Sequence, residues 1–450
     1  MYLLEVFGQK ILLECGLYQG RREESIQRNC CFPFAPSSLD AVVLSHAHLD
    51  HCGNLPNLTK QGFTGSIYCT FATRSLASIM LEDSANIQRS DAEFVSKQRA
   101  KRGQPPVEPL YTSTDAEMAI RQFVAVGYDR PVRVANGVTV TFRDAGHILG
   151  SAQVVLDLRD PSSSQRSRYL FTGDIGRGRD LILRDPQPVE NVDYLQIEST
   201  YGGREHQSKD TAAEMLRTAL QTLERGGKVI VPAFSVGRTQ QFVYALNQFS
   251  RENKLPDAPI FVDSPLSVNA TEVHRLHPEC FNEETYKFLR DVASPFEMGN
   301  LTYIRDVEQS KKLNTLQGPA IIISASGMAE AGRVRHHLAN HIGNPENLIL
   351  FIGYCAEHTL GHQILSGKSP VNIFGEPHEV KARVLLVDYL SGHADRSELL
   401  DHVRRISGPL RKIFVVHGEE EQSLALAEAL EKMKPHAKVI VPRRGEAHEC

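Results

Sequence analysis

The sequence contains no tryptophan, no Cys-X-X-Cys pair and no long uninterrupted apolar run. A transmembrane helix needs about 18 or more consecutive apolar residues, so we expect none. The first residues, MYLLEVFGQKILLE, interrupt their apolar stretch with Glu5 and Lys10 and have no small-residue cleavage site, which is not typical of a signal peptide. The eight cysteines follow no disulfide framework and resemble buried thiols of a reducing compartment. These absences predict a cytoplasmic protein without membrane contact.

The sequence also lacks an excess of positive charge. Its net charge is −4, and it has no basic tail, which argues against a protein that coats nucleic acid. It does not exclude a nuclease that binds phosphates locally. The aromatic residues show no stacking pattern that would indicate base-specific recognition. A hydrophobic fraction of 41% and a charged fraction of 23% are ordinary for a globular protein with a substantial core.

Two patterns of secondary structure follow one another along the chain. Short apolar runs bounded by turn residues predict strands in the first part, at 11–16, 41–46, 65–70, 138–146, 152–158, 169–176 and 194–200. Beyond residue 200, helices at 210–227, 238–249, 267–277 and 329–342 alternate with strands at 228–234, 259–265, 320–326 and 347–354, which indicates parallel βαβ units. Strands at 383–393 and 412–419, each followed by a helix, end the chain. We therefore expect one domain from residues 1–200 and 381–450, with a second domain, 201–380, inserted into it.

The segment SHAHLDHCG, residues 45–53, gathers His46, His48, Asp50 and His51 directly after a predicted buried strand. His46 and His48 are two positions apart, so both can reach one ion from an extended backbone. Asp50 and His51 follow at the start of a helix, near enough to bind a second ion. Imidazole and carboxylate ligands suit zinc. A single histidine is usually an ordinary core or surface residue, but this density favours a metal site.

Further candidate ligands stand where other apolar strands stop beside a glycine. They are His147 in RDAGHILGS, Asp174 in LFTGDIGR and His417 in FVVHGEE. Glycine permits the backbone of another segment to approach closely. Taken alone, Asp174 would more often be an ordinary turn aspartate. Together with residues 45–53, the three side chains predict a larger metal site.

This ordered set of ligands resembles the metallo-β-lactamase superfamily. Other segments resemble its β-CASP nuclease branch, most of all the prokaryotic relatives of the cleavage and polyadenylation endonuclease subunit: ESTYGGR 198–204, VPAFSVGRTQ 231–240, VDSPLSVNAT 262–271, SASGMAEAGRVRHHL 324–338, SGHADRSEL 391–399 and HGEEEQ 417–422. The resemblance covers essentially the whole chain. It implies an α/β protein in which an αββα metallo-β-lactamase sandwich carries an inserted β-CASP domain with a parallel sheet.

The resemblance also implies roles for the ligands. One zinc ion would be bound by His46, His48 and His147, the other by Asp50, His51 and His417, with Asp174 bridging the two. Two metal ions about 3.5–4 Å apart can acidify a water molecule and bind the phosphoryl oxygens of the substrate.

Two further residues have roles implied by the same resemblance. The implied catalytic set includes His393 and Asp50. His393 would supply the proton that the leaving oxygen needs, since histidine titrates near neutral pH. Glu198 would accept a hydrogen bond from the other ring nitrogen of His393. Without the resemblance, His393 would be interpreted as a residue in the turn before a helix.

The inserted domain contains candidate phosphate contacts. A helix at 329–342 would place Ser326 and Gly327 at its N-terminus, where backbone N–H groups bind anions, and Arg333 would add a guanidinium group. Arg238 and Ser267 occupy similar strand-to-helix junctions. For each residue, a helix cap or a packing contact is an equally good interpretation.

The sequence departs from the family pattern at two places. Glu14, in LLECGLYQG, replaces an aspartate that orients the metal loop, and the longer side chain would shift this loop slightly. The chain starts at MYLLEV, where relatives have a glycine-bearing strand start upstream, so a truncated N-terminus would leave the first strand short. Neither departure removes a metal ligand.

The resulting hypothesis is a zinc-dependent endoribonuclease that cuts single-stranded RNA. Whether it also has 5′–3′ exonuclease activity, and whether it forms a homodimer, are left open. A DNA nuclease of the same branch is an alternative, although DNA-repair members tend to have valine where His417 stands. An inactive RNA-binding scaffold is another, but the complete ligand set and His393 argue against it. A small-molecule hydrolase would not need the inserted domain.

Overall fold

The computed structural model describes residues 1–18, 22–291, 294–353 and 355–450. Tyr354, the last residue of the strand predicted at 347–354, lies outside these ranges. The chain divides into two compact units. The first comprises Met1–Gly178, Asp185–Arg204 and His393–Cys450, and the second comprises Arg179–Arg184 and Glu205–Gly392.

The first unit contains two β-sheets whose inner faces form one core. The five-stranded sheet has the order β1 (Tyr2–Val6), β2 (Gln9–Leu13), β3 (Ala41–Val43), β4 (Ser66–Thr70) and β5 (Phe123–Val126). The seven-stranded sheet has the order β20 (Lys438–Ile440), β19 (Lys412–Val416), β10 (Tyr194–Glu198), β9 (Arg166–Phe171), β8 (Ala152–Arg159), β7 (Val138–Asp144) and β6 (Val132–Ala135).

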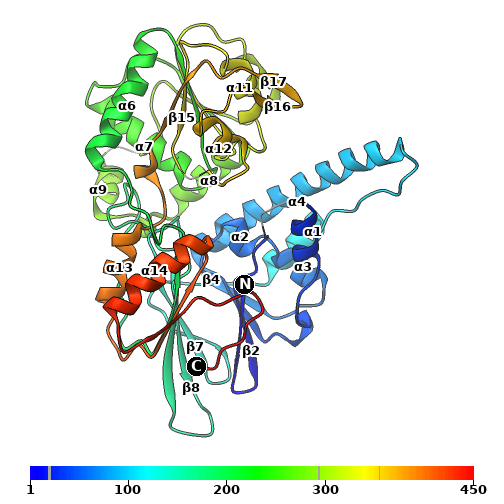
Figure 1. Ribbon diagram of the computed structural model, residues 1–450, viewed down its shortest axis with the longest axis vertical. Helices are drawn as coiled ribbons and strands as arrows, with labels where there is room; N and C mark the ends of the chain where they lie inside the picture. The colour runs from blue at the N-terminus through cyan, green and yellow to red at the C-terminus, as the bar shows by residue number, and fades with distance from the viewer. Residues whose placement is uncertain (19–21, 292–293, 354) are drawn as a thin grey trace. The chain divides into compact units, whose positions relative to one another are not determined.

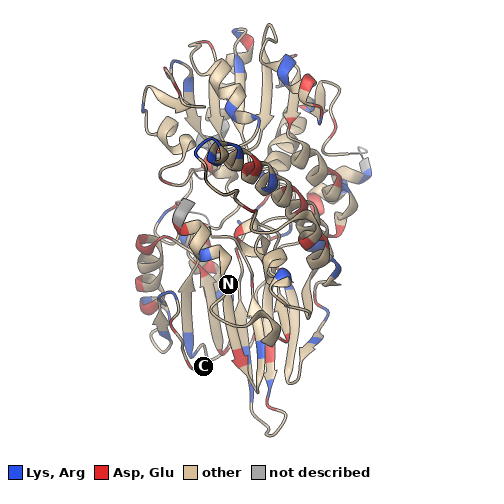
Figure 2. Ribbon diagram, turned by 90° about the vertical axis from the view of Figure 1, so that its right-hand side faces the viewer, with Lys and Arg blue, Asp and Glu red and all other residues tan. Residues whose placement is uncertain are grey.

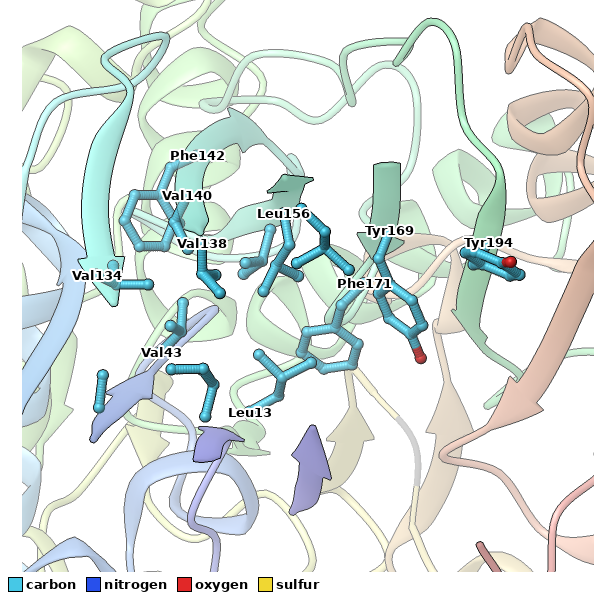
Figure 3. Close-up of a cluster of buried hydrophobic side chains, with 14 of the residues drawn as sticks. Leu13, Val43, Val134, Val138, Val140, Phe142, Leu156, Tyr169, Phe171 and Tyr194 are labelled. Atoms are coloured by element: carbon cyan, nitrogen blue, oxygen red, sulfur yellow. The ribbon is translucent and has the colours of Figure 1, made fainter. Parts of the chain in front are cut away.

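Alternating side chains explain how the sheets of the first unit pack. In β7 every second residue is buried, as expected for a strand with one face on a core. Val138, Val140 and Phe142 thereby meet Leu13 and Val43 of the other sheet in one apolar cluster (Figure 3). Burial of such aliphatic and aromatic side chains is the main favourable contribution to folding.

Helices cover the outer faces of both sheets in the first unit. The helices are α1 (Arg22–Cys30), α2 (Leu49–Cys52), α3 (Leu55–Lys60), α4 (Phe71–Ala100), α5 (Ser113–Arg121), α13 (Arg396–Arg405) and α14 (Glu420–Met433), with a 3₁₀ turn at Pro36–Ser38. Helix α4 packs on β4 and β5. Leu399 of α13 and Leu426 of α14 pack in a second apolar cluster with Leu195 of β10 and Ile413 of β19. The expected αββα layering is confirmed (Figure 1).

The second unit has a six-stranded sheet in which every pairing is parallel. Its order is β13 (Leu301–Ile304), β12 (Ile260–Asp263), β14 (Ala320–Ser324), β11 (Lys228–Pro232), β15 (Leu348–Phe351) and β18 (Arg383–Leu386). All five residues of β14 are buried, because helices cover both faces of such a sheet. Strand β18 belongs to this unit, whereas the sequence analysis assigned residues from 381 onward to the first domain.

The remaining elements of the second unit are helices and one small hairpin. The helices are α6 (Lys209–Glu224), α7 (Arg238–Arg251), α8 (Pro265–Leu276), α9 (Glu283–Asp291), α10 (Val307–Leu313), α11 (Val334–His341) and α12 (Leu360–Leu365), with 3₁₀ turns at Pro278–Cys280 and Asp388–Leu390. Strands β16 (Val371–Ile373) and β17 (Glu376–His378) form an antiparallel pair. Charged residues of both signs are spread over the helices and strands of each unit (Figure 2).

One predicted helix begins later than expected. The sequence predicted a helix over 329–342, but α11 begins at Val334. Ala329 and Gly332 have φ angles of 60° and 79°, a left-handed conformation that a right-handed helix cannot contain. The expectation that Ser326 and Gly327 lie at a helix N-terminus is therefore wrong. Of the helices in the described ranges, none is long and apolar enough to cross a lipid bilayer.

Candidate metal centre

The predicted ligands come together because their strands end at the same edge of a sheet. Strands β7 and β9 are both antiparallel to β8, and β9, β10 and β19 are parallel to one another, so these four strands share one direction. His147, Asp174 and His417 lie in the loops after β7, β9 and β19, and Glu198 is the last residue of β10. Strand β3 of the other sheet leads into residues 45–51. All these residues belong to the first unit.

One group of four ligand atoms lies around His48. Its Nδ1 is 3.1 Å from the Nε2 of His46 and 3.1 Å from the Nε2 of His147. The Oδ2 of Asp174 is 3.5 Å from the Nε2 of His46 and 3.6 Å from that of His147. His46, His147 and Asp174 are almost completely buried. The four side chains thus point toward a common centre, and three of them are buried.

A second group lies around His51 and His417, whose Nε2 atoms are 3.3 Å apart. The Oδ2 of Asp50 is 3.8 Å from each of these nitrogens. The Oδ1 of Asp174 is 3.4 Å from each of them. This group is more open than the first, since the side chains of Asp50 and His417 are 42% and 30% exposed. Asp174 therefore faces the first group with one oxygen and the second group with the other.

The chemistry of these atoms fits metal ions. In the described part of the chain, the buried Oδ1 of Asp174 has no hydrogen-bond partner, which is costly for a carboxylate without a cation. The Nδ1 atoms of His46 and His51 face Ser45 Oγ at 2.9 Å and Glu14 Oε2 at 2.7 Å. If each Nδ1 carries the ring proton, each Nε2 presents a lone pair to the centre, as a metal ligand does.

Glu14 holds the loop that carries the ligands. Its Oε2 accepts a hydrogen bond from His51, and its Oε1 accepts one of 2.6 Å from the backbone N–H of Ser45. Glu14 has a φ angle of 64°, which is uncommon for a residue with a side chain. A Cβ atom at the nearby Gly16 would lie 1.5 Å from the backbone oxygen of Asp50, so only glycine fits there. Glu14 thus acts in the orienting role that the family aspartate suggested.

The electrostatic environment suits cation binding. Burial lowers the pKa of His46 well below its ordinary value and that of His48 to about 4, so both rings are neutral at pH 7. Burial alone would raise the pKa of Asp174. The electrostatic effect of His417 and His51 outweighs that of burial, and the pKa of this carboxyl lies well below its ordinary value. Burial would lower the pKa of His51, but Asp174 and Asp50 outweigh it and raise that pKa well above its ordinary value. The site therefore offers the neutral rings of His46 and His48 beside an ionised carboxylate.

His393 and Glu198 form a pair at the edge of the metal centre. The Nδ1 of His393 is 3.2 Å from Glu198 Oε1 and 3.9 Å from Asp174 Oδ2. The buried Glu198 also accepts backbone hydrogen bonds of 2.7 Å from Ile175 and 3.2 Å from Thr200, which fix its carboxylate. The side chain of His393 is 21% exposed. Glu198 thus orients the ring of a histidine that solvent can reach.

Four of the five predicted phosphate contacts make hydrogen bonds within the second unit. Arg238 is buried and donates to the backbone oxygen of Leu390 and the side chain of Gln241. Arg333 Nη1 donates to Asp263 Oδ1 at 2.7 Å. Ser267 donates its backbone N–H to the cap of α8, and Ser326 Oγ accepts a hydrogen bond from the N–H of Glu330. With Gly327, their assignment to phosphate binding stays a prediction.

Comparison with known proteins identifies the family. Residues 3–162 match the model of the metallo-beta-lactamase superfamily domain, residues 239–364 the Beta-Casp domain, and residues 377–442 the Zn-dependent metallo-hydrolase RNA specificity domain. A ribonuclease of Thermus thermophilus is 34% identical over 430 residues, which cover 95% of this chain and 92% of that protein. The chain belongs to the β-CASP branch of the metallo-β-lactamase superfamily. It is an enzyme of this metal-dependent hydrolase class.

Two further relatives support the assignment to the β-CASP branch. An RNase J-like protein of Methanocaldococcus jannaschii is 30% identical over 452 residues, covering 99% of this β-CASP chain and 96% of that protein. The transcription termination factor FttA of the same organism is 28% identical over 435 residues, covering 94% of this chain and 65% of the factor. The chain therefore spans about two thirds of the termination factor's length.

Sequence reasoning missed one contributor to the site. Ser45, whose Oγ is 2.9 Å from the Nδ1 of His46, fixes the ring that faces Asp174. Its position directly before the histidine motif was the available signal. The sequence could not reveal that its hydroxyl turns toward the imidazole, because this depends on the backbone conformation of residues 44–46.

Proposed function

We propose that this chain is a zinc-dependent ribonuclease that hydrolyses phosphodiester bonds in single-stranded RNA. The observation that carries the proposal is the position of Asp174, whose two carboxylate oxygens face two separate groups of imidazoles. The match of residues 377–442 to an RNA specificity domain supports RNA as the substrate, since this stretch includes His393 and His417. Relatives named as ribonucleases support the same class of substrate.

We assign two zinc ions to the site. His46, His48 and His147 would hold one ion, Asp50, His51 and His417 the other, and Asp174 both. When bound, such ions stabilise negative charge on the phosphoryl oxygens and lower the pKa of a bound water. Zinc is favoured over harder cations because five of the seven ligands are imidazoles.

The protein's own groups orient the reactants and move protons. His393 would donate the proton that the leaving oxygen of the ribose requires, while Glu198 accepts a hydrogen bond from Nδ1 and thereby fixes the ring. Asp50 is the most exposed carboxylate of the ligand set and would orient the attacking water. The burial of His46 and Asp174 keeps bulk water away from the opposite side of the centre.

The two parts of the chain would divide the task between them. In this proposal, residues 1–200 and 381–450, apart from β18, form the metallo-β-lactamase domain that carries the chemistry. Residues 201–380 form the β-CASP domain, which would restrict the substrate to a long polymer. The match of residues 239–364 to the Beta-Casp domain supports this division.

The test is a cleavage assay with the zinc-loaded protein on end-labelled RNA and DNA of the same sequence. Each polymer is offered with a 5′-phosphate and with a 5′-triphosphate. We expect the RNA to be cut internally and the DNA to remain intact. Equal degradation of DNA would favour a DNA nuclease, and no degradation of either polymer would favour a binding scaffold.

The matched control is His393→Ala. Because His393 is not among the proposed zinc ligands, this variant should retain two zinc ions per chain and lose cleavage. Zinc content is measured by plasma mass spectrometry on the same preparation. A variant that loses zinc, or that cuts RNA at the wild-type rate, would contradict the role given to this histidine.

A further inference from the structure

The second half of α4 forms a projecting arm on the first unit. The buried side chains of α4 lie in its first half, apart from Ala92. In Figure 1 the cyan end of this helix and the segment that returns from it extend away from the sheets of the first unit. We call residues 86–110 the α4 arm. A surface helix without an apolar face buried in the core gains little stability from tertiary packing, so its sequence is free to serve another purpose.

The tip of the α4 arm is positively charged in a chain of net negative charge. Residues 94–104, FVSKQRAKRGQ, contain Lys97, Arg99, Lys101 and Arg102 and no carboxylate, although the net charge of the whole chain is −4. Lys97, Lys101 and Arg102 are exposed. Within the ranges that the structure describes, none of the four cations has an acidic partner for an ion pair. Their charge is therefore available to an external anion.

An aromatic side chain accompanies these cations. Phe94 is 64% exposed, and it lies on the same face of α4 as Lys97 and Lys101, which follow three and seven positions later. Proteins bind single-stranded nucleic acid through cationic grooves for the backbone and exposed aromatic rings on which bases stack. An apolar protein partner would match the ring but leave four cations without counter-charges.

Hydrogen bonds hold the tip of the arm in place. The returning segment donates the N–H of Val107 to Ser96 Oγ at 2.9 Å, and Arg99 Nε donates to the backbone oxygen of Pro105 at 2.8 Å. A pre-ordered surface loses less conformational entropy on binding.

The other end of α4 is attached to the loop of the metal centre. The hydroxyls of Thr70 and Thr73 donate to the backbone oxygen of Gly150 at 2.6 and 2.8 Å, and Gly150 lies in the loop that carries His147. At 1.5 Å per residue, Lys97 to Lys101 lie about 40 Å along the helix from this attachment. The arm therefore sets a fixed distance between its tip and the metal centre.

We propose that the α4 arm is a second binding site for single-stranded RNA. Lys97, Lys101 and Arg102 contact phosphates, and Phe94 stacks on a base of a strand that also occupies the metal centre. At roughly 3.4 Å per stacked nucleotide, a strand needs about 12 nucleotides to reach both places. The inference rests on the proposed ribonuclease function and adds a preference for longer strands.

The first experiment compares KM for a 30-nucleotide and a 6-nucleotide RNA. The variants are Lys97→Gln/Lys101→Gln/Arg102→Gln and Phe94→Ala. The control is Arg121→Gln/Arg159→Gln/Arg166→Gln, which removes three exposed cations from α5, β8 and β9 of the same unit, outside the match to the RNA specificity domain. We expect the first triple variant to raise KM for the long RNA about tenfold relative to the control, and to raise it far less for the short RNA. Phe94→Ala should act in the same direction and more weakly.

The second experiment measures binding without cleavage, by fluorescence anisotropy of the long RNA with zinc-loaded His393→Ala. Each phosphate contact to a single strand contributes about 0.7 to the slope of log K against log salt. The arm triple variant in this background should reduce the slope by about 2, and the control triple variant should leave it unchanged. Arm and control variants with equal KM ratios and equal slopes would overturn the arm proposal.

The two proposals fail in different ways. If the wild-type protein cuts RNA but the arm variants behave like the control, the ribonuclease proposal stands and the arm proposal falls. If no RNA is cut but the salt slope still depends on the arm, the arm binds RNA and the ribonuclease proposal falls. Absence of any RNA binding would overturn both.

Discussion

Two buried aspartates, one in each unit, have different surroundings. Asp263, at the end of β12, has an exposed side-chain fraction of 0%, and protein donors occupy both of its oxygens. Arg333 Nη1 is 2.7 Å from Oδ1, while His337 Nε2 and Ser310 Oγ are 2.7 and 2.6 Å from Oδ2. Asp174 is as buried, but its neighbouring histidine nitrogens lie 3.4 Å or more away. Protein donors thus complete the hydrogen bonding of Asp263, whereas the oxygens of Asp174 remain available to a cation.

The pKa values alone would not separate the two residues. Burial would raise the pKa of Asp263, but hydrogen bonds from His337, Ser310 and Arg333 outweigh it and lower the pKa. The pKa of Asp174 is lowered too, by the potential of histidines. Both groups are therefore ionised, and only the distances indicate which one serves the structure and which one serves a metal.

The largest effect is expected for Asp174→Asn. An amide cannot serve as an anionic ligand to two ions, so we expect zinc to fall to one ion or fewer per chain and RNA cleavage to fall below detection. Plasma mass spectrometry and the cleavage assay provide the measurements. Retention of two ions and of activity would show that Asp174 is only a structural residue.

Asp263→Asn should produce the opposite pattern. Removing this charge weakens the hydrogen bonds that the buried carboxylate accepts from the half-buried Arg333 and from His337, and a hydrogen bond to a charged group typically contributes about 1.5–3 kcal/mol of stability. Zinc content should remain at the wild-type value. Denaturant unfolding followed by circular dichroism measures the stability, and plasma mass spectrometry measures the zinc content. Lost zinc with unchanged stability would reverse the roles of the two aspartates.

Glu14→Gln tests the support around the metal centre. Glu14 accepts a hydrogen bond from His51 and another from the backbone of Ser45, and loss of such an outer contact typically weakens metal binding by about 10–100-fold. Competition with a zinc chelator measures the affinity, with Glu14→Asp as the variant that restores the family residue. An affinity equal to that of the wild type would exclude an orienting role.

His402→Gln gives the smallest expected effect and extends the comparison to a buried imidazole. Burial lowers the pKa of His402 to about 4, with Arg405 lowering it further and Asp401 opposing, and its Nε2 is 2.9 Å from Gln153 Oε1. In the folded protein the pKa of His402 lies below the ordinary value near 6.5. The neutral ring therefore makes its full contribution to stability above about pH 6.5, and this contribution is lost as the pH falls toward 4.

Between pH 7 and pH 5, the free energy of unfolding of the wild type should therefore fall by about 2 kcal/mol more than that of His402→Gln. Denaturant unfolding of both proteins at the two pH values, at equal zinc loading, measures the difference. Identical pH dependence in the two proteins would contradict a neutral, buried His402.

The sequence predicted the elements that carry the site because the signals were local. A strand ending directly at His46 fixes where the histidine cluster begins, and glycines beside His147, Asp174 and His417 mark the ends of three other strands. The structure brings these residues together. Which oxygen of Asp174 faces which imidazoles could not be predicted, because it depends on the convergence of loops from two sheets.

Other features escaped the sequence analysis for identifiable physical reasons. Strand β13 is short and mostly half-buried, so it has no clear periodicity. Residues 329–333 have the composition of a helix, but left-handed residues delay its start to Val334. Arg333 was assigned to phosphate because it follows a strand, whereas its guanidinium contacts Asp263. The cations of the α4 arm are separated by Gln98 and Ala100, so no continuous basic block was apparent.

The central claim is that Asp174 joins two ligand groups into one centre with two metal ions. The most direct test is a crystal structure of the zinc-loaded protein with anomalous diffraction measured on both sides of the zinc absorption edge. We predict two anomalous peaks, one among His46, His48 and His147 and one among Asp50, His51 and His417, each in contact with a different oxygen of Asp174. A single peak, or peaks without contact to Asp174, would contradict this account.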